Sequence, residues 1–89
     1  MRAVITVIGK DTVGILAKVS GICAEHKANI VDVTQTVMQD LFAMIMLAEI
    51  GDINIDFPAL SDKLTSAGSE LGLSVHVMHE DIFNSMHRI

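Results

Sequence analysis

Apolar and polar residues alternate along the chain with two different periods, one typical of strands and one of helices. Apolar or alternating runs predict strands at residues 2–8, 30–39, 41–50 and 73–78. Apolar stripes at spacings of three and four predict helices at residues 13–26 and 57–71, and a shorter stripe predicts a helical tail at residues 80–89. The order βαββαβ predicts an α+β, ferredoxin-like sandwich: a four-stranded antiparallel sheet, two helices on one face and a short C-terminal helix.

Both predicted helices have recognisable ends. Asp11 or Thr12 is expected as the N-cap of the first, and Asp56 as that of the second. Gly72 is expected to end the second helix. Gly21 lies inside the first helix, which suggests close packing against the sheet, with simple tolerance of a glycine as the equal alternative. The first helix is expected to bury a single stripe, made of Ile15, Leu16, Val19, Ile22 and Cys23.

The two middle strands differ in how they are covered. Residues 30–39 alternate only in part, which suits an edge strand or a polar interface. Residues 41–50 are apolar on both faces, which predicts a central strand that is covered twice. One face should carry Phe42, Met44 and Met46, and the other Ala43, Ile45 and Leu47.

The composition indicates a small domain that self-associates. The chain has 89 residues, of which 51% are hydrophobic and only 19% charged. That is more apolar surface than a single small core needs, so either the sheet is buried on both faces or some surface is covered by a partner. We expect a homo-oligomer, either a dimer or a higher even oligomer, joined through the edges of strand 30–39 or through sheet faces.

Charge and hydropathy exclude several classes of partner. The net charge is −5 and the six basic residues are scattered, so nucleic acid is not expected as a partner. A single cysteine fits a reducing compartment. The N-terminus runs directly into a strand, and the longest apolar run, residues 41–48, is too short to span a bilayer. A cytoplasmic protein without a membrane partner is expected.

The junction between the first strand and the first helix carries the most distinctive chemistry. Residues 9–17 read GKDTVGILA, so two glycines bracket an acidic residue and a hydroxyl where a strand turns into a helix. Such a junction presents unpaired backbone N–H groups at the positive end of a helix dipole. It can hold a small anionic group, such as the carboxylate of an amino acid.

This junction, followed by Ala28-Asn29-Ile30 at the start of the second strand, resembles the ACT domain over residues 1 to about 79. The tail from Ile82 to Ile89 is similar to that of the small free-standing UPF0237 members of that family. The resemblance implies an ACT-like regulatory domain at residues 1–79, with residues 80–89 as the C-terminal helical tail of the same domain. It also implies a ligand between subunits, no cofactor and no catalytic activity.

The resemblance implies a ligand site at the loop, completed by the start of the second strand of a neighbouring subunit. Backbone N–H groups of residues 13–15 would take a carboxylate, and Asp11 would accept an ammonium group. The structural alternative stays open: Asp11 caps the helix, Gly14 permits close packing, and Asn29 makes a turn. The implied ligand-binding residues are Asp11, Thr12, Val13, Gly14, Ile15 and Leu16, together with Asn29 and Ile30.

Neither a metal site nor an enzyme is expected from the remaining residues. His76 and His79 should point to opposite faces of the last strand. Cys23 lies on a buried stripe, and the loop after the first strand pairs Lys10 with no arginine, unlike that of acylphosphatases of similar fold. The leading hypothesis is therefore a regulatory domain that binds an amino acid, and the alternative is a protein–protein adaptor that docks through its sheet face or tail.

Overall fold

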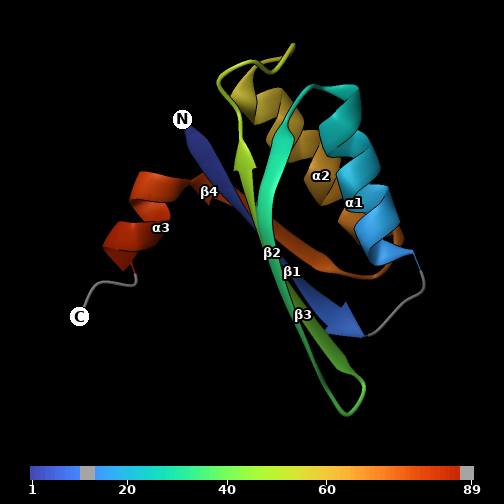
Figure 1. Cartoon of the computed structure of the whole chain (residues 1–89). Helices are drawn as coiled ribbons and strands as arrows, with labels where there is room; N and C mark the ends of the chain where they lie inside the picture. The colour runs from blue at the N-terminus through green and yellow to red at the C-terminus, as the bar shows by residue number, and fades with distance from the viewer. Residues whose placement is uncertain (11–13, 87–89) are drawn as a thin grey trace.

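The computed structural model describes residues 1–10 and 14–86 of the chain. It confirms the predicted fold class, including the short helix after the last strand (Figure 1). Each predicted element is present, with ends that differ from the prediction by at most a few residues. The elements are β1 (Arg2–Lys10), α1 (Ile15–Glu25), β2 (Asn29–Met38), β3 (Leu41–Glu49), α2 (Phe57–Glu70), β4 (Ser74–His79) and α3 (Glu80–Met86).

The four strands form one antiparallel sheet in the order β2-β3-β1-β4. The prediction that β2 lies at an edge and β3 in the centre is therefore confirmed. A bulge between Ile30 and Asp32 shifts the register of β2 against β3. Helices α1 and α2 cover one face of the sheet, and α3 lies on the other side of the strands (Figure 1). We call the face under α1 and α2 the inner face, and the opposite one the outer face.

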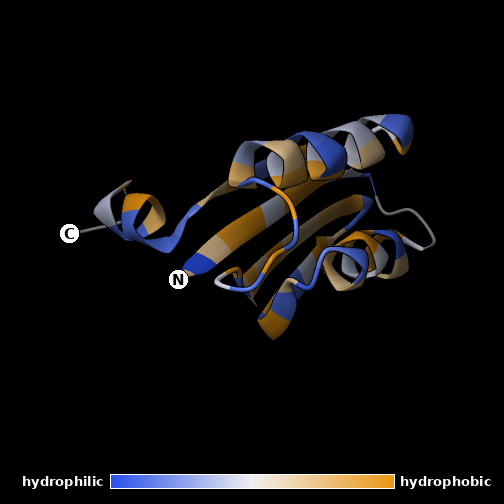
Figure 2. Cartoon of the chain, turned by 90° about the horizontal axis from the view of Figure 1, so that it is seen from above, coloured by the Kyte–Doolittle hydropathy of each residue, from blue (hydrophilic) through white to orange (hydrophobic). Residues whose placement is uncertain are grey.

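The core lies between the inner face and the two long helices. The alternation along β3 is as predicted, because its even-numbered residues are buried and face the helices. Figure 2 shows the apolar segments concentrated on the strands and on the sides of the helices that meet them. The largest fully buried side chains are Ile5, Val7, Val19, Cys23, Met44, Met46, Leu60 and Leu64.

The outer face is not covered as predicted. Ile45, at the middle of β3, is 44% exposed, and Ile8 and Leu41 are exposed to a similar extent. Helix α3 reaches only part of this face, because it is short and its contacts are chiefly with β1 and β4 rather than with β2 and β3. The second cover expected for β3 is thus only partly supplied within one chain.

The start of α1 also differs from the prediction. The helix begins at Ile15, and its N-cap is Gly14, which adopts a left-handed conformation with φ of 86°. The expectation that Asp11 or Thr12 caps this helix is therefore wrong, and both residues lie outside the described part of the chain. Leu16 is 40% exposed, so it lies outside the buried stripe. Gly21 is exposed with open space around it, which supports simple tolerance rather than close packing.

Both long helices end in the same hydrogen-bonded motif. At the end of α2, the N–H groups of Gly72 and Leu73 donate to the carbonyls of Ser69 and Gly68, respectively. Gly72 has a left-handed φ of 74° and ends the helix, as predicted. At the end of α1, Lys27 occupies the equivalent left-handed position with φ of 62°. Asp56 is the N-cap of α2, as predicted, although its side chain makes no capping hydrogen bond.

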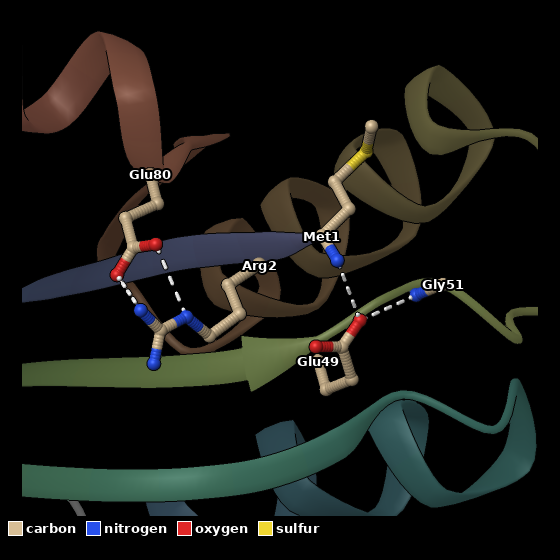
Figure 3. A network of polar contacts seen from close by, with 5 residues as sticks. All are labelled: Met1, Arg2, Glu49, Gly51 and Glu80. Carbon is tan, nitrogen blue, oxygen red and sulfur yellow. Dashed lines mark hydrogen bonds and ion pairs between the residues drawn. The ribbon is translucent and has the colours of Figure 1, made fainter.

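Two ion pairs fasten the chain ends to the sheet (Figure 3). The N-terminal ammonium of Met1 donates to Oε1 of Glu49 at 3.0 Å, and the Gly51 N–H donates to the same oxygen at 2.9 Å. Arg2 contacts Glu80 twice, through Nε at 3.0 Å and through a terminal nitrogen at 2.9 Å. Because Glu80 is the first residue of α3, this two-point contact holds the helix against β1.

Glu49→Gln is expected to lower stability near neutral pH and to have less effect in acid. The hydrogen bond from Gly51, then that from the N-terminal ammonium, lowers the pKa of Glu49. A lowered pKa means that the ionised side chain stabilises the fold above its usual pKa, and that this contribution is lost as the pH falls through the lowered value. Urea unfolding of both proteins between pH 7 and about pH 3 measures this convergence.

Asp52→Asn is the matched control for this prediction. It removes the same charge three positions away, from an exposed residue with no side-chain hydrogen bond among those described. A stability difference between Glu49→Gln and the wild type that stays constant from neutral to acidic pH would contradict the role given to the Glu49 carboxylate.

Among the described residues, no helix is both long enough and apolar enough to cross a membrane.

Candidate functional site

The first part of the predicted site is the amino end of α1. The first helical hydrogen bond runs from the N–H of Lys18 to the carbonyl of Gly14 at 2.9 Å. The N–H groups of Ile15, Leu16 and Ala17 therefore precede the first helical bond and form the positive end of the helix dipole. This moves the predicted anion-binding N–H groups from residues 13–15 to residues 15–17.

The left-handed conformation of Gly14 is what turns the chain into α1. A side chain at this position would meet no atom of the described chain within 4 Å, so close packing does not explain the glycine. Its positive φ does, because that region is strained for residues with a Cβ. Gly14 and Leu16 are both exposed, whereas the side chain of Ile15 is buried in the core, so Ile15 can offer a ligand only its backbone N–H.

The second part of the predicted site is the start of β2. Asn29 is exposed, and its side chain makes no hydrogen bond within residues 1–10 and 14–86. It is the first residue of β2 and pairs with Glu49 across the sheet. The left-handed turn residue is Lys27 instead, so the alternative in which Asn29 makes the turn is wrong. The side chain of Asn29 is thus available for contacts outside its own chain.

A broad depression of about 680 Å³ lies beside Asn29. One wall is the start of β2, with Asn29 and Ile30, and the other is the outward side of α1. That side of α1 carries only small residues, which sequence reasoning did not assign to the site. The sequence did contain a signal for this wall, because small residues recur at spacings of three and four along the helix. They are Ala17, Ser20, Gly21 and Ala24.

The two parts of the site are far apart in a single chain. Helix α1 separates them, since Gly14 precedes it and Asn29 follows it. Its 11 residues have a length of roughly 16 Å at the usual rise per residue. A ligand the size of an amino acid cannot reach from one to the other. Asp11, Thr12 and Val13 lie outside the described residues, so the structure places only Gly14, Ile15, Leu16, Asn29 and Ile30 of the predicted set.

The histidines and the cysteine do not form a reactive centre. His76 and His79 point to opposite faces of β4, as predicted, and His79 stacks on Phe57 with ring centroids 4.3 Å apart. Burial raises the pKa of the Cys23 thiol, which keeps it in its unreactive protonated form. No group of three or more acidic, histidine or cysteine residues in the described chain is arranged to hold a metal ion.

His26 has a structural role that the sequence did not suggest. It is buried at the end of α1, and its Nδ1 lies 2.8 Å from Oδ1 of Asn54. The Asn54 amide nitrogen donates to the carbonyl of Glu25 at 3.3 Å, and its backbone N–H donates to that of His26. Asn54 therefore ties the loop before α2 to the end of α1, immediately before the turn that leads to Asn29.

Comparison with known proteins identifies the family and supports the fold. The family model of the ACT domain matches residues 2–78. A UPF0237 protein of Methanocaldococcus jannaschii is 53% identical over 88 residues, which cover 99% of this chain and 98% of the relative. A UPF0237 protein of Listeria innocua is 49% identical over the full length of both chains. An ACT domain protein from Streptococcus pneumoniae has a similar structure, with a TM-score of 0.80, 38% identity and 98% coverage of each chain.

These matches define the class as a small ACT domain, a class of regulatory, ligand-binding modules. Within that class, the chain belongs to the UPF0237 family.

Proposed function

We propose that this chain is a non-catalytic regulatory domain of the cytoplasm that binds an amino acid between two of its copies. In this proposal the ACT domain spans residues 1–79, and residues 80–89, which include α3, are the tail of the same domain. The observation that carries the proposal is the separation of Gly14 from Asn29 by the length of α1. Because these two exposed halves of the proposed site cannot meet within one chain, a second chain is needed to complete it.

The topology of the sheet supports a way for the two halves to meet. Strand β2 is an edge strand, so one side of its backbone lacks a partner strand in the described chain. Lys10 and Met38 both pair with Leu41, so β1 ends at the same end of the sheet as β2 does. Antiparallel pairing of two β2 strands would place the start of one beside the finish of the other. Asn29 of the partner subunit would then lie next to the loop that precedes α1.

The chemistry of the two halves suits a zwitterionic ligand. The N–H groups of residues 15–17 at the amino end of α1 would bind the carboxylate. Asp11 would accept the ammonium group, and its expected structural role as the cap of α1 has been taken by Gly14. Asn29 of the partner subunit can donate to or accept from either group. Thr12, Val13, Leu16 and Ile30 would line the remainder of the site.

Regulation would follow from linkage between binding and assembly. A ligand that contacts two chains binds the dimer more tightly than the monomer. It therefore favours the dimer, and the dimer in turn raises the affinity for the ligand by the same factor. The chain would report the concentration of an amino acid as a change in its own assembly.

A thermal-shift screen of the standard amino acids tests this proposal, followed by calorimetry on the amino acid that raises the melting temperature most. We expect one ligand per chain, and an affinity that falls about tenfold or more in Asp11→Ala through loss of a charge-assisted hydrogen bond. Asp62→Ala, an exposed acidic residue of α2, is the control and should bind as the wild type does. A screen without any shift would contradict the proposal and favour the adaptor hypothesis.

A further inference from the structure

The buried ring of His26 has one nitrogen with a hydrogen-bond partner and one without. Its Nδ1 lies 2.8 Å from Oδ1 of Asn54. Its Nε2 is shielded from solvent and has no hydrogen-bond partner among the described residues. A buried polar atom without a partner is rare in a native fold and calls for an explanation. Nε2 is therefore the atom through which this ring can still gain an interaction.

The contacts of Asn54 decide which nitrogen of the neutral ring carries the proton. The amide nitrogen of Asn54 donates to the carbonyl of Glu25 at 3.3 Å, so the amide oxygen is the atom that faces His26. An amide oxygen only accepts hydrogen bonds, so Nδ1 must be the donor. This tautomer is assigned from the hydrogen-bond network. In the neutral ring, Nε2 is consequently an acceptor without a proton.

A carboxylate faces Nε2 from the neighbouring residue. Oε1 of Glu25 lies 3.9 Å from Nε2, so in the neutral ring two acceptors face each other and cannot bond. A proton on Nε2 turns this pair into a charged donor and a charged acceptor. His26 is also the C-cap of α1, where the helix dipole favours a positive charge. The surroundings of the ring thus supply partners for both nitrogens only in its charged form.

The other charges around the ring largely offset one another. His26 lines a groove of about 350 Å³ between α1 and α2, which lie side by side (Figure 1). The charged residues in this groove are Lys18 and Glu25 of α1 and Asp62, Lys63 and Glu70 of α2. Lys18 and Glu70 pair at 3.9 Å, and the adjacent Asp62 and Lys63 have opposite charges. The loop before α2 adds the acidic Asp52 and Asp56 on either side of the uncharged Asn54. A positive ring therefore meets no excess of positive charge.

We propose that a proton on Nε2 of His26 closes the ion pair with Glu25 and thereby fixes the turn between α1 and β2. The turn follows His26 directly, and two hydrogen bonds back to α1 define it. The N–H of Lys27 donates to the carbonyl of Ala24 at 3.2 Å, and the N–H of Ala28 donates to that of Cys23 at 2.8 Å. Histidine is the side chain whose charge ordinarily changes between about pH 5 and pH 8, so the turn responds to pH in that range.

The turn leads to Asn29, the first residue of β2 and one half of the ligand site under the proposed function. A closed turn holds Asn29 in place before the ligand arrives, which reduces the cost of ordering it on binding. The closed turn also binds the proton more tightly than an open turn does, because only the closed turn holds the ring against both of its partners. Protonation therefore favours the closed turn at low pH, and this contribution is lost as the pH rises. Ligand binding should strengthen as the pH falls.

Amide hydrogen exchange of Lys27 and Ala28 tests the turn without any ligand. We expect the protection factors, which correct for the intrinsic effect of pH on exchange, to be about two- to fivefold higher at pH 5.5 than at pH 8. That is the effect of a partly exposed ion pair, since the side chain of Glu25 is 69% exposed. Glu25→Gln keeps the shape of the side chain without its charge and should remove most of this difference. Glu70→Gln removes the same charge from the other wall of the groove, where it contacts Lys18, and should keep the difference.

His26→Asn separates the ring from every other titrating group. Asparagine can still donate to Asn54, but it cannot become charged. A folded His26→Asn or Glu25→Gln that keeps the full difference of the wild type would overturn the proposal, as would a wild type with equal protection at both pH values. Nitrogen chemical shifts of the ring give a further check, because a neutral His26 with its proton on Nε2 would contradict the assigned tautomer.

The link to the ligand site rests on the proposed function and has a separate readout. Calorimetry with the amino acid that the thermal-shift screen returns should give an affinity about two- to fivefold higher at pH 5.5 than at pH 8, and Glu25→Gln should lose this dependence. Equal affinities at the two pH values, together with exchange that does respond, would overturn the link to Asn29. If no amino acid binds, the proposed function fails, and hydrogen exchange still decides whether His26 controls the turn.

Discussion

A mixture of the Asp11→Ala and Asn29→Ala variants will bind the amino acid that the screen identifies, although neither variant alone binds it tightly. In each pure variant every site lacks one of its two halves. In a mixed dimer, the loop of the Asn29→Ala chain and Asn29 of the Asp11→Ala chain are both intact and belong to the same site. The other site of that dimer lacks both halves.

Random pairing after joint unfolding and refolding sets the expected size of the effect. Half of the dimers are mixed and each has one intact site, so about a quarter of all sites should bind with the affinity of the wild type. Calorimetry measures this fraction as the stoichiometry of the tight phase. The control mixes Asp11→Ala with Asp62→Ala. Both of these variants keep Asn29, so every site that uses the loop of an Asp62→Ala chain should be intact.

The outcome distinguishes a shared site from two separate ones. Restored binding requires that the two residues act across an interface, since roughly the length of α1 separates the loop from Asn29 in one chain. A mixture that binds no better than its two components would contradict the shared site. If Asn29→Ala alone binds as the wild type does, Asn29 is not part of the site.

Gly68→Ala will destabilise the fold, whereas Gly21→Ala will stabilise it, although both replace a glycine inside a helix. At Gly68 the added methyl group would overlap Cγ2 of Val75, and it would lie 3.2 Å from Cβ of the same residue. Val75 is buried and β-branched, so it cannot rotate away easily, and α2 must move from β4. Overpacking of this kind costs about 1–3 kcal/mol.

Gly21 is the matched control, because its surroundings are open within 4 Å and it is exposed. The same substitution there only removes backbone freedom from the unfolded chain, which stabilises the fold by about 0.5–1 kcal/mol. Urea denaturation of the two variants measures both signs. In the double variant Gly68→Ala, Val75→Ala, the loss should be smaller than the sum of the two single losses. Equal stability of Gly68→Ala and the wild type would show that α2 and β4 are not packed as described.

Most of the fold could be predicted because its signals are local. Period-two runs and helical stripes depend only on neighbouring residues, and they located all seven elements. The ends of the helices were less predictable. Asp11 and Thr12 are good capping residues, yet α1 begins later because the left-handed Gly14 starts the helix there. Leu16 was counted with the buried stripe, but it lies at the margin of that stripe, where only the position of the sheet decides its exposure.

The sequence by itself determined the type and order of the elements, the family, and the loop that carries the special backbone chemistry. Only the tertiary structure decided where those parts lie relative to one another. It placed Asn29 at the far end of α1 from Gly14, left the edge of β2 without a partner strand among the described residues, and left Ile45 exposed on the outer face. These are properties of strand order and of contacts between residues far apart in the chain. Local patterns do not encode them. A strand that is apolar on both faces has the same sequence pattern whether its second face is covered by its own chain or by another copy.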